Sequence, residues 1–393
     1  MKTNNNLLII TSAFPNNLHE YEWIFIKEQL KFIKKEFDNI YVIRPQYYIN
    51  SKLDFFNLLP STWKEKPIRQ DYVIDNIYVF FPKISILWFI KNFQIKEFIE
   101  KKKIKFDVIH SHFIYPSWEI GNYLKKIYNK PHIITWHWFD VYNLPFRNIF
   151  WKYKIKKILK QADVITTVSK SNANKLGLLW FDNIKIIPNW FDEKNFCYIE
   201  NKNRLKKELN IPLNKKILLT VWNLISIKNQ KTLILACKEL LKKRKDFICY
   251  IIWNWPLKNE LQKLINENNL QDYVKLLWQK KTEKVARYMN AADLFVFPSL
   301  SESFWVVQIE SMACGTPIVA TINWWSEEIV TSEDYGVLMK EKNNTVLLAN
   351  KINKWLEKQW NKKKIINYVK NNFSYKKILS SYIDLYENIN YTL

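Results

Sequence analysis

Short apolar runs alternate with stretches in which apolar residues recur three and four positions apart, and this alternation continues along most of the chain. The runs are typical of strands, and the spaced stretches are typical of amphipathic helices. Since neighbouring parallel strands need a crossover connection, the alternation predicts an α/β protein with parallel sheets. In the first half, the predicted strands span residues 6–14, 39–45, 76–83, 106–113, 132–139 and 163–170.

The strand pattern begins again in the second half, after a polar stretch at 201–216. The second series of predicted strands spans residues 217–222, 247–253, 273–278, 294–300, 316–322 and 336–340. A chain of 393 residues commonly exceeds what a single core supports. We therefore predict two doubly wound domains with a junction near residues 188–200.

The composition favours a cytoplasmic protein. No stretch is long and apolar enough to suggest a spanning helix. The N-terminal segment has a single lysine and an apolar run that breaks at Pro15, which does not fit a signal peptide.

The formal charge of +24 comes from 61 Lys and Arg against 37 Asp and Glu. Lys greatly outnumbers Arg, and Ile and Asn are abundant, which favours a base-composition bias acting on solvated surfaces. Peripheral contact with an anionic membrane, at its inner face, is the main alternative. Nucleic acid is the least favoured partner.

Glycine is scarce and tryptophan abundant, with 4 Gly and 18 Trp, although Gly ordinarily makes up roughly 7% of residues. Residues 320–330, ATINWWSEEIV, place Trp324 and Trp325 in a turn after a predicted strand. Such turns often need a positive φ, which Gly adopts freely and Trp resists. The two tryptophans are therefore expected either to crowd a ligand crevice or to adopt backbone conformations that suit glycine.

Residues 297–320 carry the most informative chemistry. They run from a strand end into a helix that Gly315 is predicted to cap. Free amides near 304–306, at the start of this helix, would suit a phosphate. Glu302 and Glu310 could both accept hydrogen bonds from hydroxyl groups of one ligand. The pattern alone equally accommodates two surface glutamates.

His110 and His112 lie on one face of a predicted strand and suggest a metal. However, no carboxylate or cysteine completes a recognisable ligand set, and the four cysteines show no zinc-like spacing. We predict no metal site.

Residues 301–330, with seven residues between Glu302 and Glu310, resemble the donor-site signature of the family-4 (group 1) glycosyltransferases of the GT-B fold. Further similar segments, including VWNLISIKNQKTLILA, HSHFIYPSWEIG and ITWHWFDVY, extend the resemblance over nearly the whole chain. It implies an acceptor-side Rossmann-like domain (1–188), a nucleotide-sugar donor domain (189–372) and a C-terminal helix (373–393) that packs back on the first domain.

The resemblance also implies a reaction. A sugar would pass from a nucleotide sugar to a glycan or lipid-linked acceptor with retention of the anomeric configuration, without a metal or another cofactor. Breaking the bond from sugar to diphosphate builds negative charge on the leaving group, so fixed positive charge lowers the barrier. Lys228 matches the family lysine at the diphosphate, and helix-end amides would come from Phe304, Trp305 and Val306.

Other residues take roles by the same resemblance. Glu310 would bind ribose hydroxyls, and Glu302 would contact the transferred sugar. Asn223 stands where the family often has Arg, so Lys228 would carry more of the charge compensation. His137 matches a histidine beside the reacting sugar, although without the motif it would be a hydrogen-bonded histidine at a strand end. Three residues would shape loops: Asp140 beside His137, and Asn189 and Asp192 in the interdomain turn.

The sequence departs from the family in one direction, because Trp stands at many family glycine positions. These are Trp23, Trp118, Trp138, Trp190, Trp222, Trp253, Trp255, Trp278, Trp305, Trp324 and Trp325. We hypothesise one cause, namely that the source reads UGA as glycine and the translation assigned tryptophan. The alternative is a Trp-rich, diverged paralogue whose indoles would obstruct the diphosphate.

Two other functions stay open. One is a catalytically inactive GT-B-like protein that binds an anionic surface or polyanion, and the other is a sugar-nucleotide epimerase. The helix-end anion site, Lys228 and the two glutamates occur together in the family order, which favours the transferase. The sugar, nucleotide, acceptor and oligomeric state cannot be read from the sequence.

Overall fold

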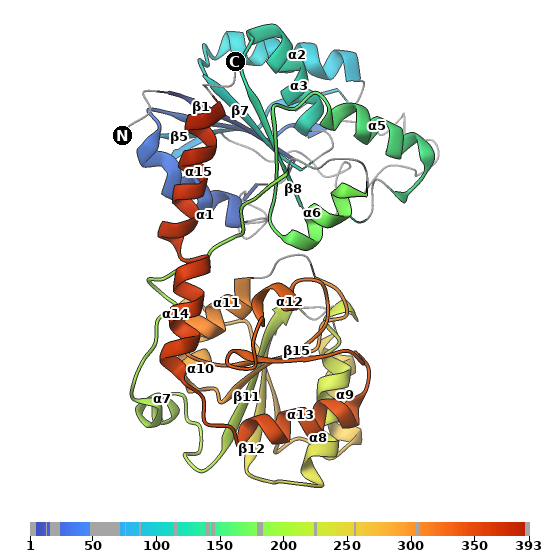
Figure 1. Ribbon diagram of the computed structural model, residues 1–393, viewed down its shortest axis with the longest axis vertical. Coiled ribbons are helices and arrows are strands. Elements are labelled where there is room, and N and C mark those ends of the chain that lie inside the picture. The colour runs from blue at the N-terminus through green and yellow to red at the C-terminus, as the bar shows by residue number, and fades with distance from the viewer. Residues whose placement is uncertain are drawn as a thin grey trace. The chain divides into compact units, whose positions relative to one another are not determined.

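The chain forms two compact units, Met1–Ile187 with Leu379–Leu393, and Pro188–Ile378 (Figure 1). The computed structural model describes residues 5–12, 14–15, 24–47, 71–74, 76–85, 88–113, 117–137, 142, 146–178, 184–223, 226–254, 257–302 and 306–389. Within these ranges, the side chains of 24–25, 88–89, 222–223 and 253–254 are left out of the description.

The first unit is built on an eight-stranded sheet in the described part of the chain, with strand order β10-β9-β8-β7-β1-β2-β5-β4. All neighbours pair in parallel except β4 and β5. Its strands are β1 (Leu7–Thr11), β2 (Ile40–Ile43), β4 (Tyr72–Ile74), β5 (Ile77–Phe80), β7 (Val108–His112), β8 (His132–Trp136), β9 (Val164–Thr167) and β10 (Ile184–Ile186). A separate two-stranded pair consists of β3 (Gln46–Tyr47) and β6 (Lys83–Ile84).

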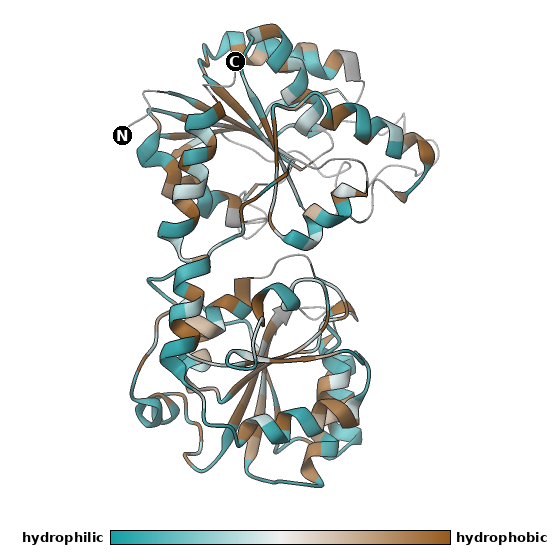
Figure 2. Cartoon of the chain, viewed as in Figure 1, coloured by the Kyte–Doolittle hydropathy of each residue, from teal (hydrophilic) through white to brown (hydrophobic). Residues whose placement is uncertain are grey.

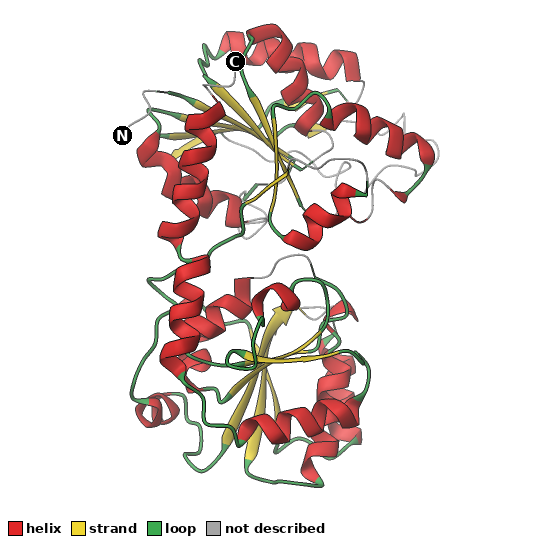
Figure 3. Cartoon of the chain, viewed as in Figure 1, coloured by secondary structure: helices red, strands yellow, loops and turns green. Residues whose placement is uncertain are grey.

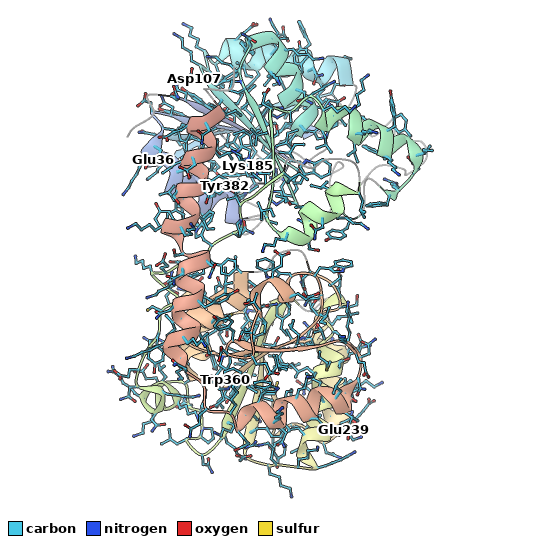
Figure 4. The ribbon with its side chains drawn as sticks, viewed as in Figure 1. Glu36, Asp107, Lys185, Glu239, Trp360 and Tyr382 are labelled. Carbon is cyan, nitrogen blue, oxygen red and sulfur yellow. The ribbon has the colours of Figure 1, made fainter. Side chains whose placement is uncertain are left out.

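Helices cover this sheet (Figure 3). They are α1 (Ile24–Ile33), α2 (Trp88–Lys101), α3 (Glu119–Tyr128), α5 (Ile149–Leu159), α6 (Lys170–Gly177) and, from Leu379 onward, α15 (Tyr375–Ile389). Two tyrosines of the C-terminal helix are buried, and Tyr382 is labelled in Figure 4. The hydroxyl of the other, Tyr386, lies 2.6 Å from Nδ1 of His110 on β7 and forms a hydrogen bond with it. From Leu379 onward, the C-terminal helix therefore packs on the first unit.

Every residue of β1, LLIIT, is buried, as expected for a central parallel strand covered on both faces. One close approach requires glycine. A Cβ on Gly121 of α3 would lie 2.2 Å from Nε2 of His132, so only a glycine lets this helix rest on β8.

The second unit holds a six-stranded parallel sheet in the described residues, with order β13-β12-β11-β14-β15-β16. Its strands are β11 (Lys216–Asn223), β12 (Phe247–Asn254), β13 (Val274–Trp278), β14 (Leu294–Phe297), β15 (Ile318–Thr321) and β16 (Gly336–Met339). Its helices are α7 (Lys202–Glu208), α8 (Gln230–Leu241), α9 (Lys258–Glu267), α10 (Thr282–Ala291), α11 (Val306–Ala313), α12 (Ser326–Ile329), α13 (Thr345–Leu356) and α14 (Lys362–Phe373).

Periodicity explains how these helices pack. In α8 the buried residues Leu233, Ile234, Cys237 and Leu240 recur three and four apart, which gives one apolar stripe against the sheet. Figure 2 shows the resulting concentration of apolar residues on the strands inside each unit.

Each strand predicted from the sequence coincides with an observed strand, whereas the short β3, β4, β6 and β10 were not predicted. The predicted helix cap also forms: Gly315 has φ +77°, and its amide bonds the carbonyl of Met312 at 2.9 Å. No helix in the described part of the chain combines the length and the apolar character that crossing a membrane requires.

Candidate functional site: the switch point of the second sheet

The second sheet reverses its strand order next to β11. The chain passes from β11 outward to β12 and β13, then returns to the other side of β11 with β14. The connections that leave the carboxyl ends of β11 and β14 therefore diverge, and open α/β sheets bind ligands at such switch points. The loop after β11 carries Lys228, and the loop after β14 carries Glu302.

Lys228 and Glu302 form a buried ion pair at this point. Nζ of Lys228 lies 2.6 Å from Oε1 of Glu302, and both side chains are 3% exposed. The hydroxyl of Ser299 lies within hydrogen-bond distance of the same carboxylate oxygen and, at 3.0 Å, of the carbonyl oxygen of Ile227, and its single proton is donated to one of these two acceptors. Two residues that lie 74 positions apart are thus held in one network.

Burial lowers the pKa of Lys228, and the contact with Glu302 works in the opposite direction. A buried ammonium is costly unless it is paired, so an anionic partner stabilises the charged form. The same ammonium would attract an anionic ligand at the switch point.

The turn after β15 is organised by two polar side chains. The carboxylate of Glu327 accepts hydrogen bonds from the amides of Asn323 (2.8 Å) and Trp324 (3.0 Å). The side-chain oxygen of Asn323 accepts from the amides of Trp325 (3.3 Å) and Ser326 (2.9 Å), and the carbonyl of Asn323 accepts from the amide of Glu302 at 3.0 Å. This turn is therefore bonded directly to the loop that carries the ion pair.

Trp324 adopts the conformation expected of a glycine. Its φ is +79° and its side chain is 43% exposed. Trp325 does not, since its φ is −98° and its buried ring meets Phe373 edge to face. Of the pair, only Trp324 thus meets the backbone expectation. Elsewhere among the suspected glycine positions, Trp118 has an ordinary φ of −67° and is buried.

Glu310 lies on α11 and is half-buried. Desolvation raises the pKa of its carboxyl to about 8, and the nearby Asp192 adds to the shift. Asp192 itself shapes a turn, because its carboxylate accepts from the amides of Lys194 (2.9 Å) and Asn195 (3.3 Å). A carboxyl that is mostly protonated at neutral pH can donate as well as accept a hydrogen bond.

The structure describes only some of the remaining residues that were predicted to bind the donor or to shape the interdomain turn. Asn223 is the last residue of β11, but its side chain lies outside the described residues, as do Phe304 and Trp305 entirely. Val306 is the first residue of α11 and is half-buried, and Asn189 is half-buried at the start of the second unit.

In the first unit, His137 follows β8 and is buried. Its Nε2 lies 3.4 Å from Nδ1 of His112, and the Phe113 ring lies 4.5 Å away between centroids. Burial, with His112 adding to it, holds the pKa of His137 well below 6.5, so its imidazole is neutral at pH 7. Asp140, predicted to orient this loop, lies outside the described residues.

The neighbouring histidines are engaged in structural bonds. His110 bonds Thr135 and Tyr386, each at 2.6 Å, and His132 bonds Ser111 and Asn122, each at 2.7 Å. Within the described ranges, no three His, Cys, Asp or Glu side chains gather as a metal site would require.

Sequence reasoning missed several contributors. Ser299, Asn323 and Glu327 organise the second-unit site. Phe113, directly after β7, has φ +67°, a strained value for a bulky residue. Polar residues just after strand ends were the available signal for Ser299 and Asn323, whereas Glu327 lies within α12. Nothing in the sequence signalled the Phe113 conformation.

Two parallel-sheet, Rossmann-like domains define the architecture of the GT-B glycosyltransferases. HepE of Anabaena, solved in complex with UDP, matches the fold with a TM-score of 0.74, covering 98% of this chain and 100% of that chain at 16% identity. The pattern of the group 1 glycosyl transferases matches residues 201–372, and that of glycosyltransferase family 4 matches residues 58–195.

Two proteins that are similar in sequence are also named as glycosyltransferases. An uncharacterized glycosyltransferase of Methanocaldococcus jannaschii is 30% identical over 298 residues, covering 76% of this chain and 78% of the relative. TuaC of Bacillus subtilis, named for teichuronic acid biosynthesis, is 26% identical over 329 residues, covering 80% of each chain. This chain therefore belongs to the group 1 glycosyltransferases.

Proposed function

We propose that the protein moves a hexose from a nucleotide sugar to a glycan or lipid-linked acceptor and retains the anomeric configuration. The observation that carries this proposal is the buried Lys228–Glu302 pair at the switch point of the second sheet. The UDP in the HepE complex and the polymer named for TuaC support the choice of donor and acceptor classes.

In this proposal the second unit binds the donor. Lys228 compensates the negative charge that grows on the leaving diphosphate, with the amide of Val306 and its neighbours at the start of α11 as further donors. This fixed charge supplies the compensation without a resident metal. Glu302 holds the ammonium and contacts the transferred sugar, and Glu310 bonds the ribose hydroxyls.

The first unit contributes the acceptor side and His137. A neutral imidazole can donate a hydrogen bond to a sugar hydroxyl without adding a charge. In a retaining transfer the acceptor approaches the face from which the diphosphate departs. The acceptor oxygen then bonds to the anomeric carbon as the bond to the phosphate oxygen breaks, and the hydroxyl proton passes to that departing oxygen.

The test is a screen of nucleotide sugars with glycan and lipid-linked acceptors, followed by NMR assignment of the product anomer. Retention predicts a product with the donor's anomeric configuration, and inversion would overturn the proposed mechanism. Consumption of a donor without any acceptor, giving an isomeric sugar nucleotide, would indicate an epimerase instead. Binding without turnover would indicate an inactive binding protein.

A His137→Ala variant refines the test. We expect turnover to fall about 10²-fold, because one hydrogen bond to the reacting sugar is lost. Donor affinity should stay nearly unchanged, and His137→Gln, which keeps a donor, should lose less. Equal loss of donor binding in both variants would contradict the assigned role.

We further propose that Trp324 stands at a codon that the source reads as glycine. The support is its φ of +79°, where a Cβ is strained. The ordinary φ of Trp118 and Trp325 gives no such support. Sequencing the gene settles the question, since a UGG codon for Trp324 would refute the proposal and a UGA codon would support it.

A further inference from the structure

The exposed face of α5 is unusual for a water-facing helix. Ile149 is 85% exposed, Tyr153 70% and Phe150 65%, and Phe146 just before the helix is also exposed. Scattered apolar residues on a surface are ordinary, but a contiguous group marks an interaction site.

The orientation of α5 is fixed from its other side. Ile155, Ile158 and Leu159 are buried in a core cluster with Trp118 and Trp136. At about 100° per residue, Ile149, Phe150 and Tyr153 fall on the opposite side of the helix. The core therefore holds the apolar face outward, and rolling the helix inward would expose its buried residues instead.

Basic residues surround this face. The segment 146–160 contains no Asp or Glu and six basic residues, which are Arg147, Lys152, Lys154, Lys156, Lys157 and Lys160. Nζ of Lys154 lies 5.2 Å from the centroid of the Trp151 ring, and Nζ of Lys175, on α6, lies 4.5 Å from that of Phe146. Two ammonium groups thus lie close to aromatic rings, and Figure 2 shows apolar and hydrophilic residues side by side along α5.

We infer that this surface, formed by Phe146, Ile149, Phe150, Tyr153 and the six basic residues of 146–160, docks the protein on an anionic lipid bilayer. A helix with outward apolar side chains flanked by lysines suits the headgroup boundary, where the side chains insert and the ammonium groups meet lipid phosphates.

Other occupants fit less well. A second copy placed isologously would bring two sets of six like charges together. Nucleic acid is bound through basic groups and stacked rings, and an 85% exposed isoleucine adds nothing to such contacts. The inference goes beyond the transfer reaction and does not depend on it.

The experiment is sedimentation of the full chain with phosphatidylcholine vesicles, with and without phosphatidylglycerol, at low and high salt. We expect binding that requires phosphatidylglycerol and weakens with salt. The triple variant Lys152→Gln, Lys156→Gln, Lys157→Gln should weaken binding on the order of 100-fold, at about fivefold per lysine. The triple variant Ile149→Ser, Phe150→Ser, Tyr153→Ser should also lose binding while remaining folded, because these side chains are exposed.

The matched control is Lys207→Gln, Lys275→Gln, Lys284→Gln, which makes the same charge change at exposed positions of the second unit. It should bind vesicles much more tightly than the α5 lysine variant. Equal loss in the control, or no binding of the wild type to anionic vesicles, would overturn the inference. Two further results would also overturn the inference. The first is a wild-type dimer that becomes monomeric in the serine variant while vesicle binding stays unchanged. The second is RNA binding by the wild type that is lost only in the lysine variant.

Calorimetric titration of the same variants with nucleotide sugars separates this inference from the proposed function. Donor affinity should be equal in all of them. If the protein binds vesicles but no nucleotide sugar, only the proposed function is contradicted. If it binds a nucleotide sugar but no vesicles, only the docking surface is contradicted.

Discussion

The ammonium of Lys228 and the carboxylate of Glu302 lie 2.6 Å apart in a site where both side chains are almost fully buried. Removing one member of a buried pair leaves the other charge without compensation, which costs about 3–5 kcal/mol. Under the proposed function, the pair links donor binding to the stability of the second unit.

Lys228→Met should accordingly lower the free energy of unfolding by about 3 kcal/mol. The double variant Lys228→Met, Glu302→Leu should regain more than half of that loss, because no charge then stays buried alone. The control is Lys231→Met, which breaks the exposed pair with Glu260 and should cost no more than about 1 kcal/mol. Urea unfolding followed by circular dichroism measures all three, and equal losses at Lys228 and Lys231 would contradict the account.

Glu310 makes the second unit less stable as the pH rises. Its folded pKa of about 8 exceeds the usual 4.5, so between these values the folded state holds a proton that the unfolded state has released. Glu310→Gln should therefore stabilise the protein at pH 8 by about 1–3 kcal/mol. The difference should vanish near pH 4.5, and thermal melts at the two pH values provide the measurement. A stabilisation that is the same at both would show that the carboxyl does not titrate as described.

The buried histidines give the first unit the opposite dependence. Burial lowers the pKa of His112 and His132 to about 3, so the unfolded chain binds protons below pH 6.5 that the folded chain does not. Each ring should cost about 2 kcal/mol of stability at pH 5 relative to neutral pH. Native-state hydrogen exchange should show β7 and β8 losing protection as the pH falls from 7 to 5. Unchanged opening free energies in these strands would contradict the prediction.

Trp324 offers a test of backbone strain without any assumption about its codon. Trp324→Gly and Trp324→Ala both remove the indole, but only glycine relieves a φ of +79°. The glycine variant should be more stable than the alanine variant by about 1 kcal/mol. Alanine is ordinarily the more stable choice in regular structure, so an unfolding experiment in which alanine wins would refute the assigned conformation.

The sequence allowed the strands and the fold class to be predicted because parallel strands such as β1 are continuous apolar runs between amphipathic helices. It could not show that Lys228 and Glu302 touch, since this depends on β14 returning beside β11. It also could not show that the carboxylate of Glu327 accepts a hydrogen bond from the amide of Asn323, or that Phe113 has a positive φ. These features arise from tertiary packing, which local patterns do not record.

Donor binding tests the central claim most directly. Isothermal titration calorimetry with a panel of nucleotide sugars should find at least one that binds the wild type and binds Lys228→Met at least about tenfold more weakly, because the ammonium meets the diphosphate. Lys231→Met should bind it like the wild type. Absence of binding for every nucleotide sugar, or equal affinity in Lys228→Met, would contradict the assignment of the donor site to Lys228 and Glu302.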